Sequence, residues 1–169
     1  LKYDVDLLFL KNKFGSIPLL LAAGNGQTKV VEMIINSKQG LKCISMPNKN
    51  GNTPLHLAAY YGHTEIVKLL LDTKQGLDCV CIKDKDGNTP LHDAALFGQT
   101  DVFKMLLNTN EAFDALEMKN NYKLTPLELA KEGKHKDIVA LIKSFHSSIY
   151  NPKSDFQYSK DGTCLSIAL

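Results

Sequence analysis

The chain repeats one short pattern four times at a fixed spacing, and this repetition constrains its fold more strongly than any single motif. One proline per copy marks the spacing, because successive members of this set lie 36 residues apart: Pro18, Pro54, Pro90 and Pro126. Two apolar columns keep the same step: Ala22, Ala58, Ala94 and Ala130, and Val30, Ile66, Val102 and Ile138. Chance does not maintain several apolar columns through four copies, so the chain is a repeat array. In such an array each unit covers the apolar face of its neighbour.

Each copy carries the same order of turn, helix and cap signals. In the second copy, Gly51-Asn52 predicts a turn, and Thr53-Pro54 places an N-capping threonine before a proline at the first helical position. This first helix is predicted to end at Gly62, because glycine readily adopts the left-handed C-cap conformation. Thr64 is predicted to cap a second helix whose apolar residues recur at helical spacing. Residues 77–82 are then predicted to be extended and to lead into a polar hairpin tip.

These segments resemble ankyrin repeats. The resemblance rests on Thr-Pro-Leu-His-Leu-Ala-Ala at 53–59, Gly-His-Thr-Glu-Ile-Val-Lys-Leu-Leu-Leu at 62–71 and Asp-Lys-Asp-Gly-Asn-Thr at 84–89. It covers the chain from about Val5 to Leu169. The family's usual period is about 33 residues, so each copy here is about three residues longer, and the extra residues fall near 72–78, after the second helix. The resemblance implies an all-α repeat solenoid of helix-turn-helix units with projecting hairpin loops.

The alignment of the copies divides the chain into successive repeats. Residues 1–13 align with the hairpin end of a preceding repeat, and the four ankyrin repeats are expected at 14–49, 50–85, 86–121 and 122–146. Residues 147–160 are predicted to be an irregular linker, and residues 161–169 resemble the start of a truncated fifth repeat. The array is therefore expected to continue beyond both ends of this chain.

The first and fourth copies depart from the pattern. Ile17 and Leu20 stand where the motif has threonine and histidine, which removes the polar network at that helix start. In the fourth copy Glu128 replaces the histidine, while Lys123 and Lys134 replace two turn glycines. A lysine in the left-handed conformation costs roughly 1 kcal/mol. A distorted turn is therefore predicted in the fourth copy.

The composition excludes several classes of function. All 20 basic residues are lysines, and with 18 acidic residues they leave a net charge of +2, which is too small to indicate nucleic-acid binding. Without arginine the chain lacks the planar donor fork that grips phosphate in a bidentate way. No apolar run approaches the roughly 18–20 residues that a membrane-spanning helix needs. Four cysteines are too few for a disulfide scaffold, so a cytoplasmic location is predicted, with neither nucleic acid nor direct membrane insertion.

The residue types that often carry chemistry have structural explanations in this chain. His56 and His92 are predicted to hydrogen-bond the threonine at the start of their own helices rather than to bind a metal. The remaining histidines are assigned no role: His63, His135 and His146. Three cysteines lack the Cys-x-x-Cys spacing of zinc and redox sites and are predicted to be buried thiols: Cys43, Cys79 and Cys81. No cofactor, metal or catalytic residue is predicted, and this chain is expected not to be an enzyme.

The resemblance also implies where a partner would bind. Ankyrin repeats bind other proteins on their concave face and at their hairpin tips, through variable positions ahead of the Thr-Pro motif and ahead of the helix-ending glycine. The corresponding residues here are Lys13, Phe14, Ser16, Lys49, Asn50, Asn52, Tyr60, Tyr61, Lys85, Asp86, Asn88, Leu96, Phe97, Asn121 and Tyr122. Asp93 is added as a candidate contact, because it replaces a leucine at a position expected to line the concave side.

Two groups of residues, the apolar pairs of the middle repeats and the lysines of the tips, indicate how a partner would be bound. Tyr60-Tyr61 and Leu96-Phe97 concentrate apolar bulk on the middle two repeats, and at least one residue of each pair is expected to face the concave groove. The alternative is that these side chains pack onto neighbouring repeats. Lysines also recur at the hairpin tips, in the columns Lys13, Lys49 and Lys85, and Lys11, Lys83 and Lys119. Such a basic line would steer an acidic protein surface; the alternative is a solvated rim that keeps the array soluble.

The function implied by the resemblance is that of a non-catalytic protein–protein interaction module within a larger ankyrin-repeat protein. Two alternatives stay open at this point. The chain could be the targeting arm of a multidomain enzyme such as a bacterial effector, which would act in the host cytoplasm. It could also be the cytosolic array of a membrane channel.

Overall fold

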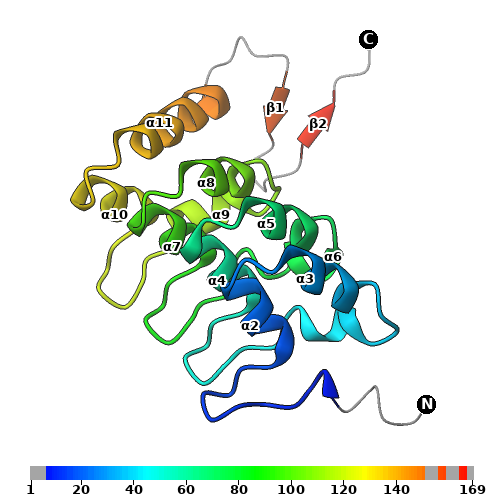
Figure 1. Ribbon diagram of the computed structural model, residues 1–169. Helices are drawn as coiled ribbons and strands as arrows, with labels where there is room; N and C mark the ends of the chain where they lie inside the picture. The colour runs from blue at the N-terminus through cyan, green and yellow to red at the C-terminus, as the bar shows by residue number, and fades with distance from the viewer. Residues whose placement is uncertain (1–6, 151–155, 159–163, 167–169) are drawn as a thin grey trace.

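The computed structural model describes residues 7–150, 156–158 and 164–166, and in this part of the chain four helix pairs stack into one array (Figure 1). The first helices of the pairs are α2 (Pro18–Gly24), α4 (Pro54–Tyr61), α7 (Pro90–Leu96) and α10 (Pro126–Glu132). The second helices are α3 (Thr28–Ile35), α5 (Thr64–Leu71), α8 (Thr100–Leu107) and α11 (Lys136–Tyr150). Each first helix packs against the next, α2 on α4, α4 on α7 and α7 on α10. The predicted all-α repeat solenoid is confirmed.

The extra residues of each repeat form an additional helical turn. These turns are the 3-10 helix η1 (Gly40–Cys43) and the short helices α6 (Lys74–Leu77) and α9 (Ala112–Glu117). The hydroxyl of Thr73 caps α6, because it accepts from Gly76 N at 3.0 Å and donates to Leu70 O at 2.7 Å. A Cβ on Gly76 would collide with Leu70 O, so this tight turn requires glycine. The prediction of extended backbone over residues 77–82 is therefore wrong.

The polar network at the helix starts forms as predicted. His56 Nδ1 lies 2.8 Å from Thr53 Oγ1 and accepts from Thr53 N at 3.2 Å, which leaves Nε2 to donate to Asn88 O of the next repeat at 3.2 Å. Burial lowers the pKa of His56 to about 4, so the ring is neutral at pH 7. The second-helix cap differs from the prediction. Thr64 is the first residue of α5, the N-cap is His63, and neither caps the helix with its side chain.

The left-handed turns of the fourth repeat are not distorted. Lys123 and Lys134 adopt φ values of 67° and 59°, close to the 77° of Gly87 in the third repeat. The fourth tip is held by Asn120, whose Oδ1 accepts from Tyr122 N at 3.0 Å and from Leu124 N at 3.1 Å. The tip therefore keeps the shape of the other tips, and the lysines carry the backbone strain.

The thiols belong to the packed interior. Cys43 and Cys79 are free and 0% exposed, and each Sγ points to a carbonyl of the preceding repeat, Leu8 O at 3.9 Å and Ile44 O at 3.7 Å. Burial raises the pKa of Cys79 to about 11, which keeps it protonated and unreactive. Cys81 is only half-buried, because its place lies at the edge of the core.

The two ends of the array differ from its middle repeats. Ile17 is the N-cap residue of α2 and makes no side-chain cap hydrogen bond, as predicted. Helix α11 continues to Tyr150, so the first residues of the expected linker at 147–160 are helical rather than irregular. Strand β1 (Phe156–Tyr158) pairs antiparallel with β2 (Cys164–Ser166). Of the expected fifth repeat only β2 lies within the described residues, and it is extended where a repeat would begin its first helix; the remaining boundaries stay predictions.

Candidate partner-binding surface

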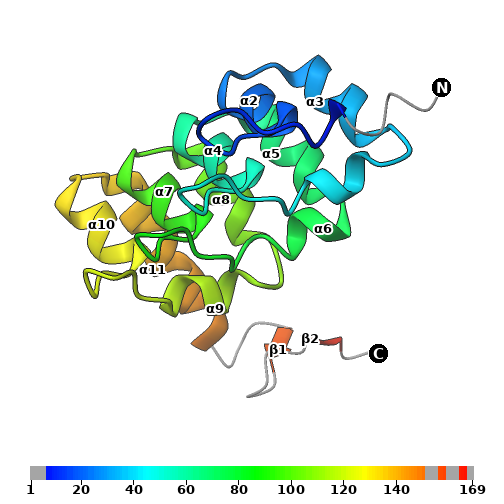
Figure 2. The same cartoon turned by 90° about the horizontal axis from the view of Figure 1, so that it is seen from below.

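The hairpin tips form one continuous edge along the array (Figures 1 and 2). Each tip donates one backbone hydrogen bond to the tip before it: Lys49 N to Phe14 O at 3.0 Å, Lys85 N to Asn50 O at 2.9 Å and Asn121 N to Asp86 O at 2.9 Å. Asn121 adds a side-chain bond, from Nδ2 to Lys85 O at 2.8 Å. Because these bonds join backbone groups, the side chains of the tips remain free to vary.

The tip lysines are open to solvent. Lys13, Lys49 and Lys85 are all exposed. Lys13 Nζ lies 4.9 Å from the centroid of the Phe14 ring, a cation–π contact, and Lys83 Nζ donates to Lys119 O at 2.8 Å. None of these lysines forms a side-chain ion pair within the described residues. The tip lysines therefore present exposed positive charge without direct ion pairs, although Asp84 and Asp86 flank Lys85 in the third tip.

An exposed apolar patch lies where the middle two repeats meet. We call Tyr60, Tyr61, Leu96 and Phe97 the aromatic patch; these residues are 37%, 55%, 38% and 41% exposed. The Tyr60 ring contacts Phe97 of the next repeat, with 3.9 Å between ring centroids, and Tyr61 of its own repeat at 4.7 Å. The Tyr60 and Phe97 rings thus pack across the repeat boundary and stay exposed, whereas the expectation that one residue of each pair faces the concave groove stays a prediction.

The ends of the first helices, including the two that carry the aromatic patch, are held by side chains to which the sequence assigns no role. His63 Nε2 hydrogen-bonds Gly24 O at 3.2 Å, Gln99 Nε2 donates to Tyr60 O at 3.1 Å, and His135 Nε2 hydrogen-bonds Leu96 O at 3.1 Å. Each residue precedes its own second helix and reaches back to the preceding repeat. The three residues occupy one column of the repeat, 36 residues apart, so this spacing was the signal that could have revealed them.

Two residues of the expected surface are buried. Asp93 is 5% exposed, although it was expected to line the concave side, and its column holds the apolar Leu57 and Leu129 in the neighbouring repeats. Burial, together with the charges of Asp84 and Asp86, raises the pKa of Asp93 to about 8. The carboxyl is therefore mostly protonated at neutral pH.

Ser16 is the second buried member, at 7% exposure, because it lies at the base of the first tip, where its N–H donates to Asn12 Oδ1 at 3.0 Å. Asn52 and Asn88 are half-buried, and Asn88 Oδ1 accepts from Asn120 Nδ2 at 2.9 Å. The other expected contact residues are exposed: Lys13, Phe14, Lys49, Asn50, Tyr60, Tyr61, Lys85, Asp86, Leu96, Phe97, Asn121 and Tyr122. The structure thus leaves twelve of the sixteen predicted positions open for contact.

The described residues contain no arrangement typical of a metal centre. No three His, Cys, Asp or Glu side chains within them gather as metal ligands would. His92, like His56, is hydrogen-bonded within the fold, with Nδ1 2.9 Å from Thr89 Oγ1 and Nε2 donating to Leu124 O at 3.2 Å. No helix among these residues has the length and hydropathy needed to span a membrane.

Comparison with known proteins agrees with the geometry. Curated proteins give no match. The family model for ankyrin repeats, in three copies, matches residues 1–81 and 75–154, which is most of the chain. Domains of this family are generally protein–protein interaction modules and typically non-catalytic. The stacked helix pairs, the projecting tips and this match lead to one conclusion: the chain belongs to the ankyrin repeat family.

Proposed function

We propose that this chain binds another protein through the aromatic patch, with the tip lysines as a surrounding rim. The observation that carries the proposal is the contact between Tyr60 and Phe97, whose rings meet at 3.9 Å and yet remain 37% and 41% exposed. Apolar side chains that stay this exposed at a repeat boundary are typical of interaction sites. The role proposed is recognition without catalysis.

The patch has the properties of an interface anchor. Tyrosine and phenylalanine offer a large contact area, and tyrosine adds a polar tip that can hydrogen-bond a partner. The rings are held before binding, because Tyr60 packs on both Tyr61 and Phe97 and its carbonyl accepts from Gln99. Little side-chain freedom is then lost on association, which favours affinity.

The lysines at the tips contribute mainly to the rate of association. Lys49 and Lys85 lie on the exposed tip edge, where water and salt screen their charges. Exposed charges of this kind steer an acidic partner toward the patch and change affinity little. Cys43, Cys79 and Cys81 are free thiols, which supports a reducing compartment such as the cytoplasm. No residue of the described structure favours an enzyme's targeting arm or a channel's array, so neither is part of the proposal.

The test compares aromatic side chains of the patch with one outside it, and Phe97 and the control Phe113 are almost equally exposed. A partner isolated by affinity capture on the full chain is titrated against Phe97→Ala, Tyr61→Ala and the control Phe113→Ala, whose ring is 40% exposed on α9. We expect Phe97→Ala and Tyr61→Ala to weaken binding by roughly 2 kcal/mol or more, as hot spots do. Lys49→Ala and Lys85→Ala are expected to cost less than about 1 kcal/mol and to alter the salt dependence. Equal affinity of wild type and both patch variants, or an equal loss in Phe113→Ala, would refute the proposal.

A further inference from the structure

The outer face of the fourth repeat differs in chemistry from the same face of the repeats before it. In the second and third repeats this face is covered by the following repeat, and Ala59 and Ala95 are 0% exposed there. Lys131 occupies the same column in the fourth repeat and is exposed. On α11, Lys143 takes the column of Leu107, which is 6% exposed. Lysines thus stand where the array elsewhere has packed apolar side chains.

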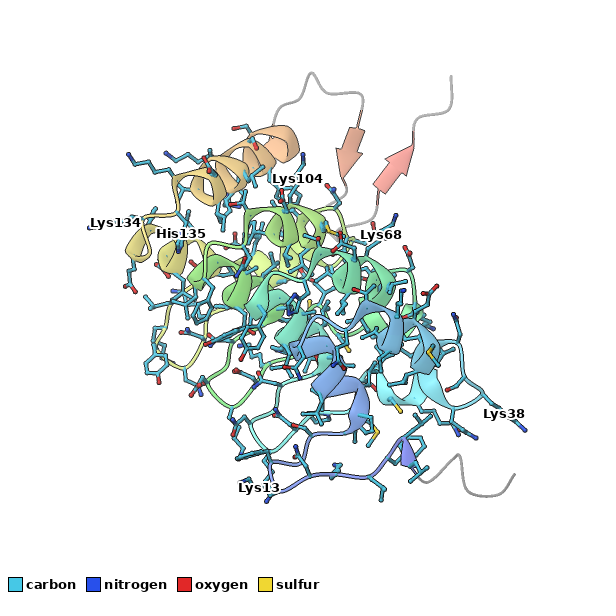
Figure 3. The ribbon with its side chains drawn as sticks, in the orientation of Figure 1. Lys13, Lys38, Lys68, Lys104, Lys134 and His135 are labelled. Atoms are coloured by element: carbon cyan, nitrogen blue, oxygen red, sulfur yellow. The ribbon has the colours of Figure 1, made fainter. Side chains whose placement is uncertain are left out.

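The left-handed turn on the same face also carries a lysine in place of glycine. A Cβ on Gly98 would lie 2.5 Å from His135 Nδ1, and a Cβ on Gly62 would collide with Gln99, because the next repeat reaches over each glycine. Lys134 fills this column in the fourth repeat, and its side chain points outward from the α10 end of the array (Figure 3). This side chain occupies the place where a neighbour's side chain lies over the glycine in the second and third repeats, so the chemistry of this face is different.

A cleft of about 450 Å³ lies on this face, and we call it the terminal cleft. Apolar side chains form its floor and lysines its rim: Ala130, Val139 and Ala140, and Lys131, Lys134, Lys136 and Lys143. All four lysines are exposed. The acids of the same repeat do not line it, and the only side-chain ion pair among the described residues joins His146 to Glu117 elsewhere. Glu128 lies within electrostatic range of Lys131, but no acidic side chain lines the cleft, so positive charge predominates around its small apolar floor.

We propose that the terminal cleft binds an acidic segment of another protein, with an apolar side chain on the floor and carboxylates on the lysine rim. Charge complementarity carries the choice of partner, because clustered like charges focus an attractive field on acidic groups. Val139 is half-buried while its equivalents Val67 and Phe103 are 0% exposed, so the floor has apolar area left to cover. The chain's own residues 151–169 carry two lysines and two aspartates, and this balanced charge does not complement the cleft.

The experiment uses the full chain and a fluorescein-labelled peptide of alternating Glu and Leu, followed by fluorescence anisotropy. The control peptide has Gln in place of Glu. We expect the acidic peptide to bind and the Gln peptide not to bind, with an affinity that falls as salt is raised. Lys131→Glu/Lys143→Glu is expected to weaken binding at least about tenfold, and the neutral pair Lys131→Gln/Lys143→Gln to weaken it by a smaller factor.

A matched variant separates a site from net charge. Lys68→Glu/Lys104→Glu makes the same charge change at two exposed lysines on α5 and α8 (Figure 3), and we expect less than about a twofold change. Equal weakening by the two charge-reversed pairs, or no binding of the acidic peptide, would overturn the proposal. So would binding to phosphatidylserine vesicles without binding to the peptide. Phe97→Ala is expected to leave peptide binding unchanged; a loss there would place the peptide on the aromatic patch, whereas the proposed function fails by its own titration.

Discussion

The third and fourth repeats share one backbone and differ where a following repeat would touch them. The third repeat has small or apolar residues at these positions, and the fourth has lysines: Gly87 and Lys123, Ala95 and Lys131, Gly98 and Lys134, and Leu107 and Lys143. A Cβ on Gly87 would lie 2.8 Å from Asn121 N of the fourth tip, so the third repeat has no room for a side chain there. The comparison teaches that the neighbour, rather than the turn itself, decides which residue each column takes.

The helix starts of the two repeats follow the same rule. His92 accepts from Thr89 N at 3.2 Å and reaches Leu124 O of the fourth repeat with its other nitrogen. Glu128 accepts from Thr125 N, at 2.6 Å, and from Thr125 Oγ1, at 3.0 Å, and bonds no other repeat. A histidine joins two repeats with its two nitrogens, whereas a carboxylate completes the cap of its own helix only.

The largest expected effect compares a core residue that is covered on both sides with its equivalent at the end of the array. Leu106 is 0% exposed in the third repeat, and Ile142 is 1% exposed in the same column of the fourth. We expect Leu106→Ala to lower the free energy of unfolding by about 2–5 kcal/mol and Ile142→Ala by less, because the terminal helix can relax into the space. Urea denaturation measures both. A larger loss for Ile142→Ala would break the comparison.

The second prediction concerns acid. The folded-state pKa of His92 is about 4, below its ordinary value of 6.5, because burial disfavours the charged ring. The unfolded state therefore binds the proton first, so this contribution to stability is complete above pH 6.5 and is lost as the pH falls toward 4. The loss is on the order of 2–3 kcal/mol. His56 behaves alike.

The measurement for this prediction is the free energy of unfolding of His92→Gln at several pH values between 7 and 4, because glutamine can hold the same cap without titrating. We expect a smaller fall in stability than in wild type. A Glu128→Gln variant of the fourth repeat serves as the contrast. The pKa of Glu128 in the wild-type chain is lowered by the hydrogen bonds from Thr125. Its contribution to stability is therefore lost only as the pH falls below the ordinary pKa of a carboxyl group. The same acid profile in His92→Gln and wild type would contradict the assignment.

The third prediction uses the leucine that the fourth repeat has in place of Asp93. The pKa of Asp93 is raised to about 8 by burial and by two nearby aspartates, so the folded state holds the proton and stability falls as the pH rises from about 4 to 8. Asp93→Leu is expected to stabilise the chain by roughly 1–3 kcal/mol at pH 8 and by less at pH 5. Thermal unfolding at the two pH values tests this. Destabilisation at both would show that the carboxyl contributes a favourable contact.

The smallest effect concerns the two strained lysines. Lys123 and Lys134 have φ values of 67° and 59°, where glycine has no steric cost. We expect Lys123→Gly and Lys134→Gly each to stabilise the chain by about 1 kcal/mol. Lys85→Gly is the control, because Lys85 is not among the described residues with positive φ. If the control stabilised as much as the others, backbone strain would not be the cause.

The sequence predicted the features that each repeat makes by itself. The 36-residue columns located the eight long helices, and Thr53 with His56 predicted the helix cap and its hydrogen bond. The features it missed depend on a neighbour or on a small residue. The turn of α6 needs glycine at position 76 because Leu70 O leaves no room for a Cβ there. Gln99 donates to an acceptor in another repeat. Asp93 was misjudged because its column was expected to line the concave side, whereas packing buries it.

The boundary between the second and third repeats is held by hydrogen bonds at three points. Lys85 N bonds Asn50 O at the tip, His56 Nε2 bonds Asn88 O at the helix start, and Gln99 bonds Tyr60 O at the helix ends. When the two ends of the chain are pulled apart, all of these bonds must open before one repeat can separate from the next. Under force the array is therefore expected to open one repeat at a time. Each opening releases one period of 36 residues, or about 120 Å of extended chain.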